Sequence, residues 1–405
     1  MMDKKDINKV SLLVDDEVYD GWKSARIEAG IDQICRSFAV EVTDNFPGNL
    51  GKFIRLRAGQ SVVVKIGKDT VCTGYITSTP ISYNAKSVTV EIQGKSKTVD
   101  LVDCCSPWAA IGPAKTTQSG EGSDTWKDVD PDKNKTAKVS AAKVAVTSWH
   151  NQPTEKIIAD LCAPYGISVV CKSDIGGKHT NFTVNPGEKV FESINRLLVK
   201  DNLIVTDDEF GNLLIAEVGQ EGVADDELKT GENVLTGRAE FDANPLYSTY
   251  AVLGQHKGSD LEFGRQVSQD KSIQTSSFVG RYRLLVVKDT GQSSKQSAES
   301  LSSYEKEFRE AKYFSALHLV QGWRQSSSKL WRPNQLVDLY DSVLQIKGQN
   351  HLVQKVVFVL DAGGAIAQIA SIPKKGYGRK GGKTDKLQGK SNKAISSSNA
   401  WADVK

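Results

Sequence analysis

The residues that could do chemistry in this chain do not stand at spacings that build a reactive centre. The five histidines are scattered and form no His-x-x-x-His pair, and the six cysteines form no Cys-x-x-Cys pair. Metal sites need several donor atoms within about 2–2.6 Å of the ion, usually from closely spaced residues. A Gly-x-Ser-x-Gly nucleophile elbow is also missing. We therefore predict no catalytic residues, no metal and no cofactor.

Acidic clusters and glycine-rich stretches also lack the context that catalysis or nucleotide binding would need. The carboxylates at 207–209 and 225–227 stand in turn-like segments, which favours solvated turns over a paired acid and base. The stretch Gly94–Ser96 would need a glycine at position 89 to wrap a phosphate, and Thr89 stands there. The Gly-x-Gly-x-x-Gly match at 376–381 precedes no helical pattern. Neither stretch indicates a nucleotide site.

The elements that would position any site are mostly strands. Short β-branched segments with Gly- and Asn-containing turns fill residues 7–105, which is typical of a barrel or small sandwich. Two amphipathic helical patterns and several strands follow, and then strands return; the block 335–372 echoes the block 60–105. The predicted fold is α+β and β-dominated, with two related β-barrel-like domains flanking a small α/β module. The predicted parts are a first β-barrel domain at 1–105, a long polar loop or insertion at 106–148, an α/β module at 149–230, a second β-barrel domain at 231–373 with a helix at about 297–318, and a disordered basic tail at 374–405.

Composition excludes several classes of protein. The 405 residues include 39% hydrophobic and 25% charged residues, which is ordinary for a globular chain and too hydrophobic for wholesale disorder. No apolar stretch approaches the roughly 20 residues of a membrane helix, and the first residues lack the apolar core of a signal peptide. The cysteines are therefore expected to be reduced thiols, mostly buried. The net charge of +3 is concentrated in the tail, which has nine Lys or Arg and two Asp.

One stretch of the sequence is distinctive. Residues 91–106 read Glu-Ile-Gln-Gly-Lys-Ser-Lys-Thr-Val-Asp-Leu-Val-Asp-Cys-Cys-Ser, which closely resembles the hallmark of the tail protein P family of Mu-like phages, the baseplate hub of contractile tails. Other pieces occur in the family's order, and together they span about 7–373; the stretch 106–148 and the tail depart from the family pattern. The residues that carry the resemblance are Trp22, Gly74, Tyr75, Gly94, Lys95, Ser96, Asp100, Leu101, Asp103, Cys104, Trp149, Gly166, Trp323, Trp331, Pro333 and Asn334.

This resemblance implies a structural hub without enzymatic activity. The family forms a homotrimer in which two related barrels per chain make a ring of six, matching the sixfold tail tube to the threefold central spike. The implied partners are copies of the chain itself, the tube protein, the spike protein and other baseplate proteins, with DNA only as passing cargo. The implied location is the virion baseplate, after assembly in the host cytoplasm. Two alternatives stay open: a hub–spike component of a related contractile injection or secretion machine, and a hub with cell-wall hydrolase activity.

Within the hallmark, we predict structural roles. Gly94 is expected to turn the chain where a side chain would clash. Leu101 and Val102 are expected to be buried, and Cys104 to act as a small core residue. The segment Trp331–Asn334 is interpreted as a tryptophan anchor before a turn, with its proline ending regular strand pairing.

Overall fold

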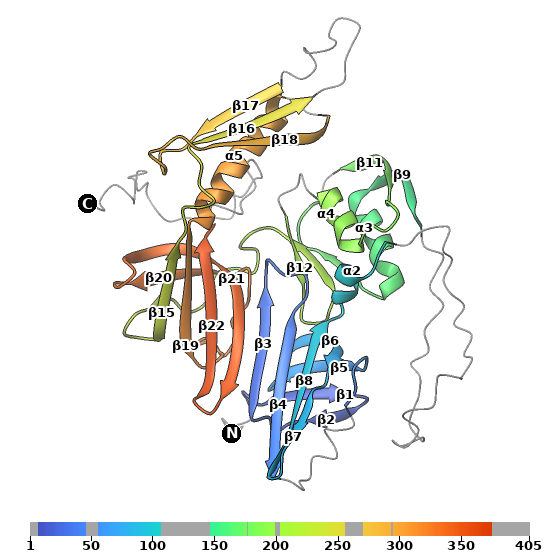
Figure 1. Cartoon of the computed structure of the whole chain (residues 1–405), viewed down its shortest axis with the longest axis vertical. Coiled ribbons are helices and arrows are strands. Elements are labelled where there is room, and N and C mark those ends of the chain that lie inside the picture. The colour runs from blue at the N-terminus through green and yellow to red at the C-terminus, as the bar shows by residue number, and fades with distance from the viewer. Residues whose placement is uncertain are drawn as a thin grey trace, which may run out of the picture.

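The computed structural model describes residues 7–45, 56–106, 146–175, 177–198, 203–255, 270–292 and 295–374. Strands dominate these residues, and several short helices and one long helix accompany them (Figure 1). The predicted β-dominated fold is therefore confirmed. Most of the predicted polar loop, 107–145, and nearly all of the predicted basic tail, 375–405, lie outside the described residues.

The first barrel consists of strands in the order β3-β4-β8-β6-β5-β1-β2, with β7 attached to β8. Their bounds are β1 Val10–Val14, β2 Glu17–Tyr19, β3 Ser24–Gly30, β4 Ser37–Asn45, β5 Ser61–Ile66, β6 Asp69–Ser78, β7 Ile81–Tyr83 and β8 Ser87–Ser96. Side chains alternate between core and surface, as strand geometry requires: Val62, Val64 and Ile66 are buried along β5, and Ser61 is exposed.

The second barrel has the strand order β15-β19-β22-β21-β20, and the two-residue β14 runs parallel to β20. The bounds are β14 Leu228–Lys229, β15 Val234–Phe241, β19 Phe314–Gln321, β20 Leu336–Asp341, β21 Ile346–Asp361 and β22 Gly364–Pro373. The long strand β21 joins the two barrels, because its first part pairs with β20 and its last part pairs with β3. The two barrels thus share one sheet, and one hydrophobic cluster contains residues of both.

An α/β module stands between the two barrels in the sequence and has its own hydrophobic core. Its elements are α2 Val99–Asp103, β9 Ser148–Pro153, α3 Thr154–Cys162, the 3₁₀ helix η1 Ala163–Tyr165, β10 Val169–Cys171, β11 Lys178–Thr183, α4 Val190–Leu198, β12 Ile204–Asp207 and β13 Leu213–Ala216. Strands β10, β13 and β12 form a three-stranded sheet, and β9 pairs with β11. Trp149 is buried between these parts, with its indole Nε1 donating to Asp160 Oδ2 at 3.0 Å.

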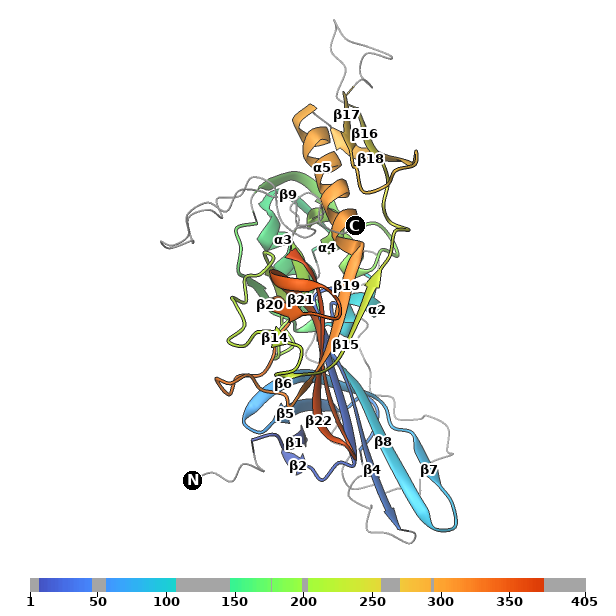
Figure 2. The same cartoon turned by 90° about the vertical axis from the view of Figure 1, so that its left-hand side faces the viewer.

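A separate small sheet is inserted between β15 and β19. It consists of β16 Thr249–Gln255, β17 Asp270–Thr275 and β18 Leu284–Gln292, and the helix α5 Lys295–Lys312 packs on one of its faces (Figure 2). The sequence did not indicate this separation from the second barrel. The helix predicted at about 297–318 also ends earlier than predicted. Phe314, Ala316, His318 and Val320 are buried at every second position, which is the period of the strand β19.

Candidate functional site

The two barrels repeat one pattern of strand pairing. Strands β3, β4, β8, β6 and β5 of the first barrel correspond in order to β15, β19, β22, β21 and β20 of the second, and every neighbouring pair is antiparallel. The echo between the blocks 60–105 and 335–372 is therefore present in three dimensions. The structural repeat also includes β3–β4 and β15–β19, outside those two blocks.

The irregularities of pairing repeat as well, and they fix the correspondence residue by residue. A register shift falls between Ile76 and Ser78 where β6 meets β8, and between Val353 and Lys355 where β21 meets β22. A second register shift falls where β5 meets β6 and where β20 meets β21. The number of residues between the two shifts is the same along β6 as along β21. Because β-bulges are specific features of a strand pair rather than defects, two bulges in the same register indicate a duplicated domain.

The hallmark glycines lie where the first barrel packs most closely. The predicted turn at Gly94 is wrong, because Gly94 lies within β8, near its end and opposite Phe38 of β4. A Cβ at Gly94 would lie 2.3 Å from Phe38 Cε1 and 2.5 Å from the carbonyl oxygen of Tyr75. A Cβ at Gly74 would lie 1.9 Å from the carbonyl oxygen of Lys95. Both glycines are thus required by close approach.

At the corresponding positions the second barrel has a different set of residues. Ala316 stands in place of Phe38, His351 in place of Gly74 and Ser371 in place of Gly94. One barrel therefore fills its interior with a large aromatic ring beside two glycines, and the other with a small residue beside two polar side chains. His351, Ser371 and the nearby His318 are each at most 2% exposed.

This polar group inside the second barrel was not singled out from the sequence. His318 Nε2 lies 3.2 Å from Asp341 Oδ2, whereas both ring nitrogens of His351 and Ser371 Oγ have no hydrogen-bond partner among the described residues. Burial lowers the pKa of His351 to about 4 and also lowers the pKa of His318, despite its carboxylate partner. The two histidines are neutral at neutral pH and buried in the barrel interior.

The α/β module is fixed to the first barrel by a buried ion pair. Asp207, at the end of β12, accepts hydrogen bonds from Arg36 N at 2.9 Å and from Arg36 Nε at 3.2 Å. Its side chain is 1% exposed, which corrects the prediction of a solvated turn for this residue. Burial raises the pKa of Asp207 above its ordinary value, and the Arg36 guanidinium opposes this shift. Arg36 N also donates to the hallmark hydroxyl Ser96 Oγ at 3.1 Å.

The other residues of the predicted hallmark lie in α2, in the first barrel and in the module. Leu101 in α2 is fully buried in the core of the α/β module, as predicted, whereas Val102 and Cys104 are only half-buried. Asp103 is exposed, and burial raises the pKa of Asp100. Tyr75 and Lys95 are register partners between β6 and β8. Gly166 ends η1 with φ of +65°, and Trp22 is buried in the core that the two barrels share.

All six cysteines are free thiols, and only Cys72 and Cys162 are fully buried.

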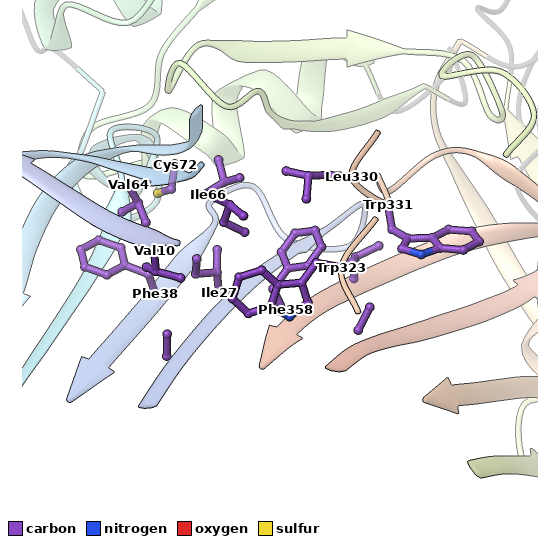
Figure 3. Close-up of a cluster of buried hydrophobic side chains, with 14 of the residues drawn as sticks. Val10, Ile27, Phe38, Val64, Ile66, Cys72, Trp323, Leu330, Trp331 and Phe358 are labelled. Atoms are coloured by element: carbon purple, nitrogen blue, oxygen red, sulfur yellow. The ribbon is translucent and has the colours of Figure 1, made fainter. Parts of the chain in front are cut away.

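Two tryptophans anchor the second barrel, and Asn334 ties it to the preceding segment. Trp323 Nε1 lies 3.1 Å from the carbonyl oxygens of both Val359 and Ile366, and its ring meets Phe358 edge-on (Figure 3). Trp331 is 2% exposed. Asn334 adopts a left-handed φ of +64° after the half-buried Pro333, and its side-chain amide binds Gly219 N and Glu217 O. The predicted tryptophan anchor before a turn matches this arrangement.

Arg324 connects the two barrels away from the shared strands. Its guanidinium donates to Asp69 Oδ2 at 2.6 Å, to Asn8 Oδ1 at 3.2 Å and to the carbonyl oxygens of Ile7 and Ile66. All four acceptors belong to the first barrel, while Arg324 follows β19 of the second. With the β21–β3 pairing, this fork gives the two barrels a second, polar attachment.

A cavity of about 270 Å³ lies where the two barrels and the module meet. Its lining mixes charges of both signs, including Arg36, Lys172, Glu221 and Arg332, with apolar residues such as Trp331. Among the described residues no group of three or more His, Cys, Asp or Glu is arranged to hold a metal ion, and no helix is long and apolar enough to cross a membrane.

Three family models match consecutive parts of the chain. The Mu phage baseplate assembly protein GpP-like N-terminal model matches residues 9–96, the baseplate hub protein gp44-like second-domain model matches 139–217, and the Mu phage baseplate assembly protein GpP fourth-domain model matches 294–379. The first and last of these matches cover the strands of the first barrel and most of those of the second.

Known proteins resemble the chain over almost its whole length. The baseplate hub protein gp44 of Escherichia phage Mu is 28% identical over 379 residues, covering 91% of this chain and 89% of that protein. The 43 kDa tail protein of prophage MuSo2 from Shewanella oneidensis has a TM-score of 0.74 at 24% identity, covering 92% and 100%. A tail protein from Neisseria meningitidis has a TM-score of 0.70 at 16% identity, covering 91% and 97%. These matches, together with the repeated barrel, show that the chain belongs to the family of Mu-like phage baseplate hub proteins.

Proposed function

We propose that three copies of this chain form the ring at the centre of a contractile tail baseplate. The observation that supports this proposal most strongly is the duplicated barrel, with two bulges in the same register. A trimer of such chains presents six similar domains on threefold symmetry. A ring of that kind can contact a sixfold tube on one face and a threefold spike on the other without a change of subunit.

The partners in this proposal are other copies of the chain, the tail tube protein, the central spike protein and further baseplate proteins. DNA passes through the ring as cargo and is not bound in a sequence-specific way. The assembled chain is located in the virion baseplate after assembly in the host cytoplasm. A three-dimensional reconstruction of the particle with no density for this chain between tube and spike would contradict the proposal.

The proposed role is structural and not enzymatic. Its support is that the related phage Mu protein is a baseplate hub protein, and that the histidines of the second barrel lie buried away from any substrate. Zymography of the purified full chain on peptidoglycan distinguishes this role from that of a cell-wall hydrolase. We expect no clearing, and a clear zone from pure protein would overturn the structural assignment.

The first test of the ring is the molar mass of the purified chain. Light scattering after size exclusion should give three times the 44.1 kDa of one chain. If the free chain is monomeric, the measurement is repeated with the cognate spike protein present. Failure to trimerise in both conditions would contradict the proposed ring.

A further inference from the structure

The two corresponding edge strands of the barrels have different surroundings. In the first barrel, β3 pairs with β4 on one side and with β21 on the other, from Ala25 opposite Leu360 to Gly30 opposite Lys355. In the second barrel, β15 pairs along its length with β19 alone among the described strands. Six of its eight residues are exposed, and they include Leu235 and Phe241, which are more than half exposed. An edge of this length normally requires a covering partner.

The segment that would cover β15 can be identified from the repeat. The covering part of β21 is its last part, between the bulge at Lys355 and the hairpin at Asp361. The same number of residues separates the corresponding bulge at Ser78 from the hairpin residue Asn84, and this segment contains β7. Strand β7 is therefore the counterpart of the part of β21 that covers β3.

Strand β7 is an open edge too. It pairs only with β8 among the described strands, and all three of its residues are exposed. Ile81 is 44% exposed and Tyr83 is 78% exposed. In Figure 1, β15 lies at the outer border of the second barrel and β7 at the lower end of the first. The described strands thus include β15, an uncovered edge of the second barrel, and β7, the matching uncovered strand of the first.

The side chains of β15 also correspond to those of the covered edge. Aligned through their partners on β4 and β19, Arg26 and Glu28 of β3 stand where Arg238 and Glu240 stand on β15. At the covered edge Glu28 forms an ion pair with Lys355 of β21. The uncovered edge thus has the same alternation of charges as the edge that β21 covers.

We infer that β7 of one copy adds to β15 of a second copy, antiparallel and in the register of the internal β21–β3 junction. This register places Ile81 opposite Ala239, Ser82 opposite Arg238 and Tyr83 opposite Gly237 of the second copy. On this register Tyr83 stands opposite a glycine whose side-chain direction faces Asp341 and His318 of the same barrel. The contact joins different surfaces of the two copies, so repetition of the contact produces a ring when its rotation closes. The inference rests on the proposed hub function and names its subunit interface.

Disulfide trapping tests this register. The full chain with Ser82→Cys and Arg238→Cys is oxidised under mild conditions and separated without reductant. Directly opposite residues of two paired strands lie within the Cα separation that a disulfide spans. We expect covalent dimers and trimers. The native chain and each single variant are oxidised in parallel, to measure the disulfides that form through the six native cysteines. The pair Ser82→Cys with Glu240→Cys lies on the same face two residues out of register and should give clearly less product.

A second variant tests the same contact by disruption. Tyr83→Glu places a charge in the inferred interface without disturbing the barrel core, because Tyr83 is exposed in the single chain. We expect self-association to weaken by about tenfold or more, since an unpaired charge would be buried. Val343→Glu is the matched control, because Val343 is equally exposed at 78% and lies in a turn of the other barrel. It should leave the association unchanged.

The outcomes separate this inference from the proposed function. A chain that forms trimers but gives no disulfide above the controls, and that tolerates Tyr83→Glu, has its interface elsewhere. That result overturns the inference and leaves the hub assignment standing. If another protein covers β15, trapping in purified particles yields a disulfide-linked product that lacks a second copy of this chain, and the inference again fails. Absence of the chain from the particles contradicts the proposed function itself.

Discussion

Phe38 and Ala316 occupy corresponding positions in the two barrels, and their neighbours compensate for the difference in size. Beside Phe38 stands Gly94, where a Cβ would lie 2.3 Å from the ring, whereas Gly74 is required by the backbone of Lys95. Beside Ala316 stand Ser371 and His351. A duplicated fold has therefore kept its backbone register and exchanged volume between facing strands, as interiors packed like organic crystals require.

This compensation predicts non-additive stability. Gly94→Ser alone should lower the melting temperature of the first barrel, and Phe38→Ala alone should cost about 3–5 kcal/mol through the cavity that it leaves. The double variant has the residues that the second barrel has at these two positions. We therefore expect its loss of free energy of unfolding to be smaller than the sum of the two single losses by at least about 1 kcal/mol. Differential scanning calorimetry measures all three. Gly280→Ser is the control, because nothing lies within 4 Å of a Cβ there. Simple additivity would contradict the compensation.

The buried histidine predicts a loss of stability in mild acid. The folded-state pKa of His351 is about 4, below the ordinary value of 6.5, so the unfolded chain takes up a proton first as the pH falls. Stability should therefore fall between about pH 6.5 and pH 4, by roughly 3 kcal/mol from this group. His318, whose pKa is also lowered, acts in the same direction. Chemical denaturation of the chain and of His351→Gln across this range should show a smaller fall in the variant. Parallel curves would contradict the assignment.

At the scale of elements, the two barrels differ most in how one hairpin is closed. Residues 31–36 connect β3 to β4, whereas the sheet β16–β18 and the helix α5 stand between β15 and β19. The ends of this insertion are close together, because Asp242 N donates to the carbonyl oxygen of Tyr313 at 2.8 Å. Phe241 and Phe314 are register partners at the same place. The insertion is therefore an addition to a hairpin that is already closed.

We expect the second barrel to fold without the insertion. Replacing residues 243–312 by the six residues that connect β3 to β4 should leave the amides of β19, β21 and β22 protected from hydrogen exchange. The reason is that their pairing does not use the inserted sheet. Hydrogen exchange with mass spectrometry reads this out strand by strand, and the unmodified chain is the reference. Loss of protection throughout the second barrel would mean that α5 is part of its core.

Much of this arrangement could be predicted from residue patterns, and the failures have physical causes. Short β-branched segments between turns indicated the strands of the first barrel. The two-residue period in Phe314–Val320 was misread as helix because it directly follows an amphipathic helix. Asp207 was assigned to a solvated turn because its partner, Arg36, is far away in the sequence. Gly94 was assigned to a turn because the ring that excludes a side chain there belongs to another strand. Local patterns contain no information about such partners.

The whole molecule is joined by a small number of attachments between its domains. The barrels share the β21–β3 pairing and the Arg324 fork, and the module is attached to the first barrel by Arg36 and Asp207. A buried ion pair of this kind adds little stability over apolar packing, but breaking it leaves a charge without compensation. The two barrels thus share a sheet and a hydrophobic core, whereas the module, which has a core of its own, is attached through buried polar contacts.

Removing the charge of Asp207 should loosen the module without unfolding the barrels. We expect Asp207→Asn to cost about 1–3 kcal/mol at the junction, because the Arg36 guanidinium loses its nearest carboxylate and keeps only Glu209, 3.9 Å away. Hydrogen exchange should then increase in 31–36 and in 204–216 but not in β19 or β22. Asp225→Asn is the control, since Asp225 pairs with the exposed Lys329, and such surface pairs contribute little. Equal effects of the two variants would contradict the role of the buried pair.

The pairing of β3 with β21 also has a consequence for synthesis of the chain. Strand β3 is translated near the beginning, and its partner emerges from the ribosome only after the module and the inserted sheet. During that interval the nascent first barrel presents an open strand edge, the kind of surface that recruits wrong partners on crowded polysomes. Slow translation through the middle of the gene would lengthen this exposure. Yield of soluble protein should therefore depend on how quickly the last strands follow the first.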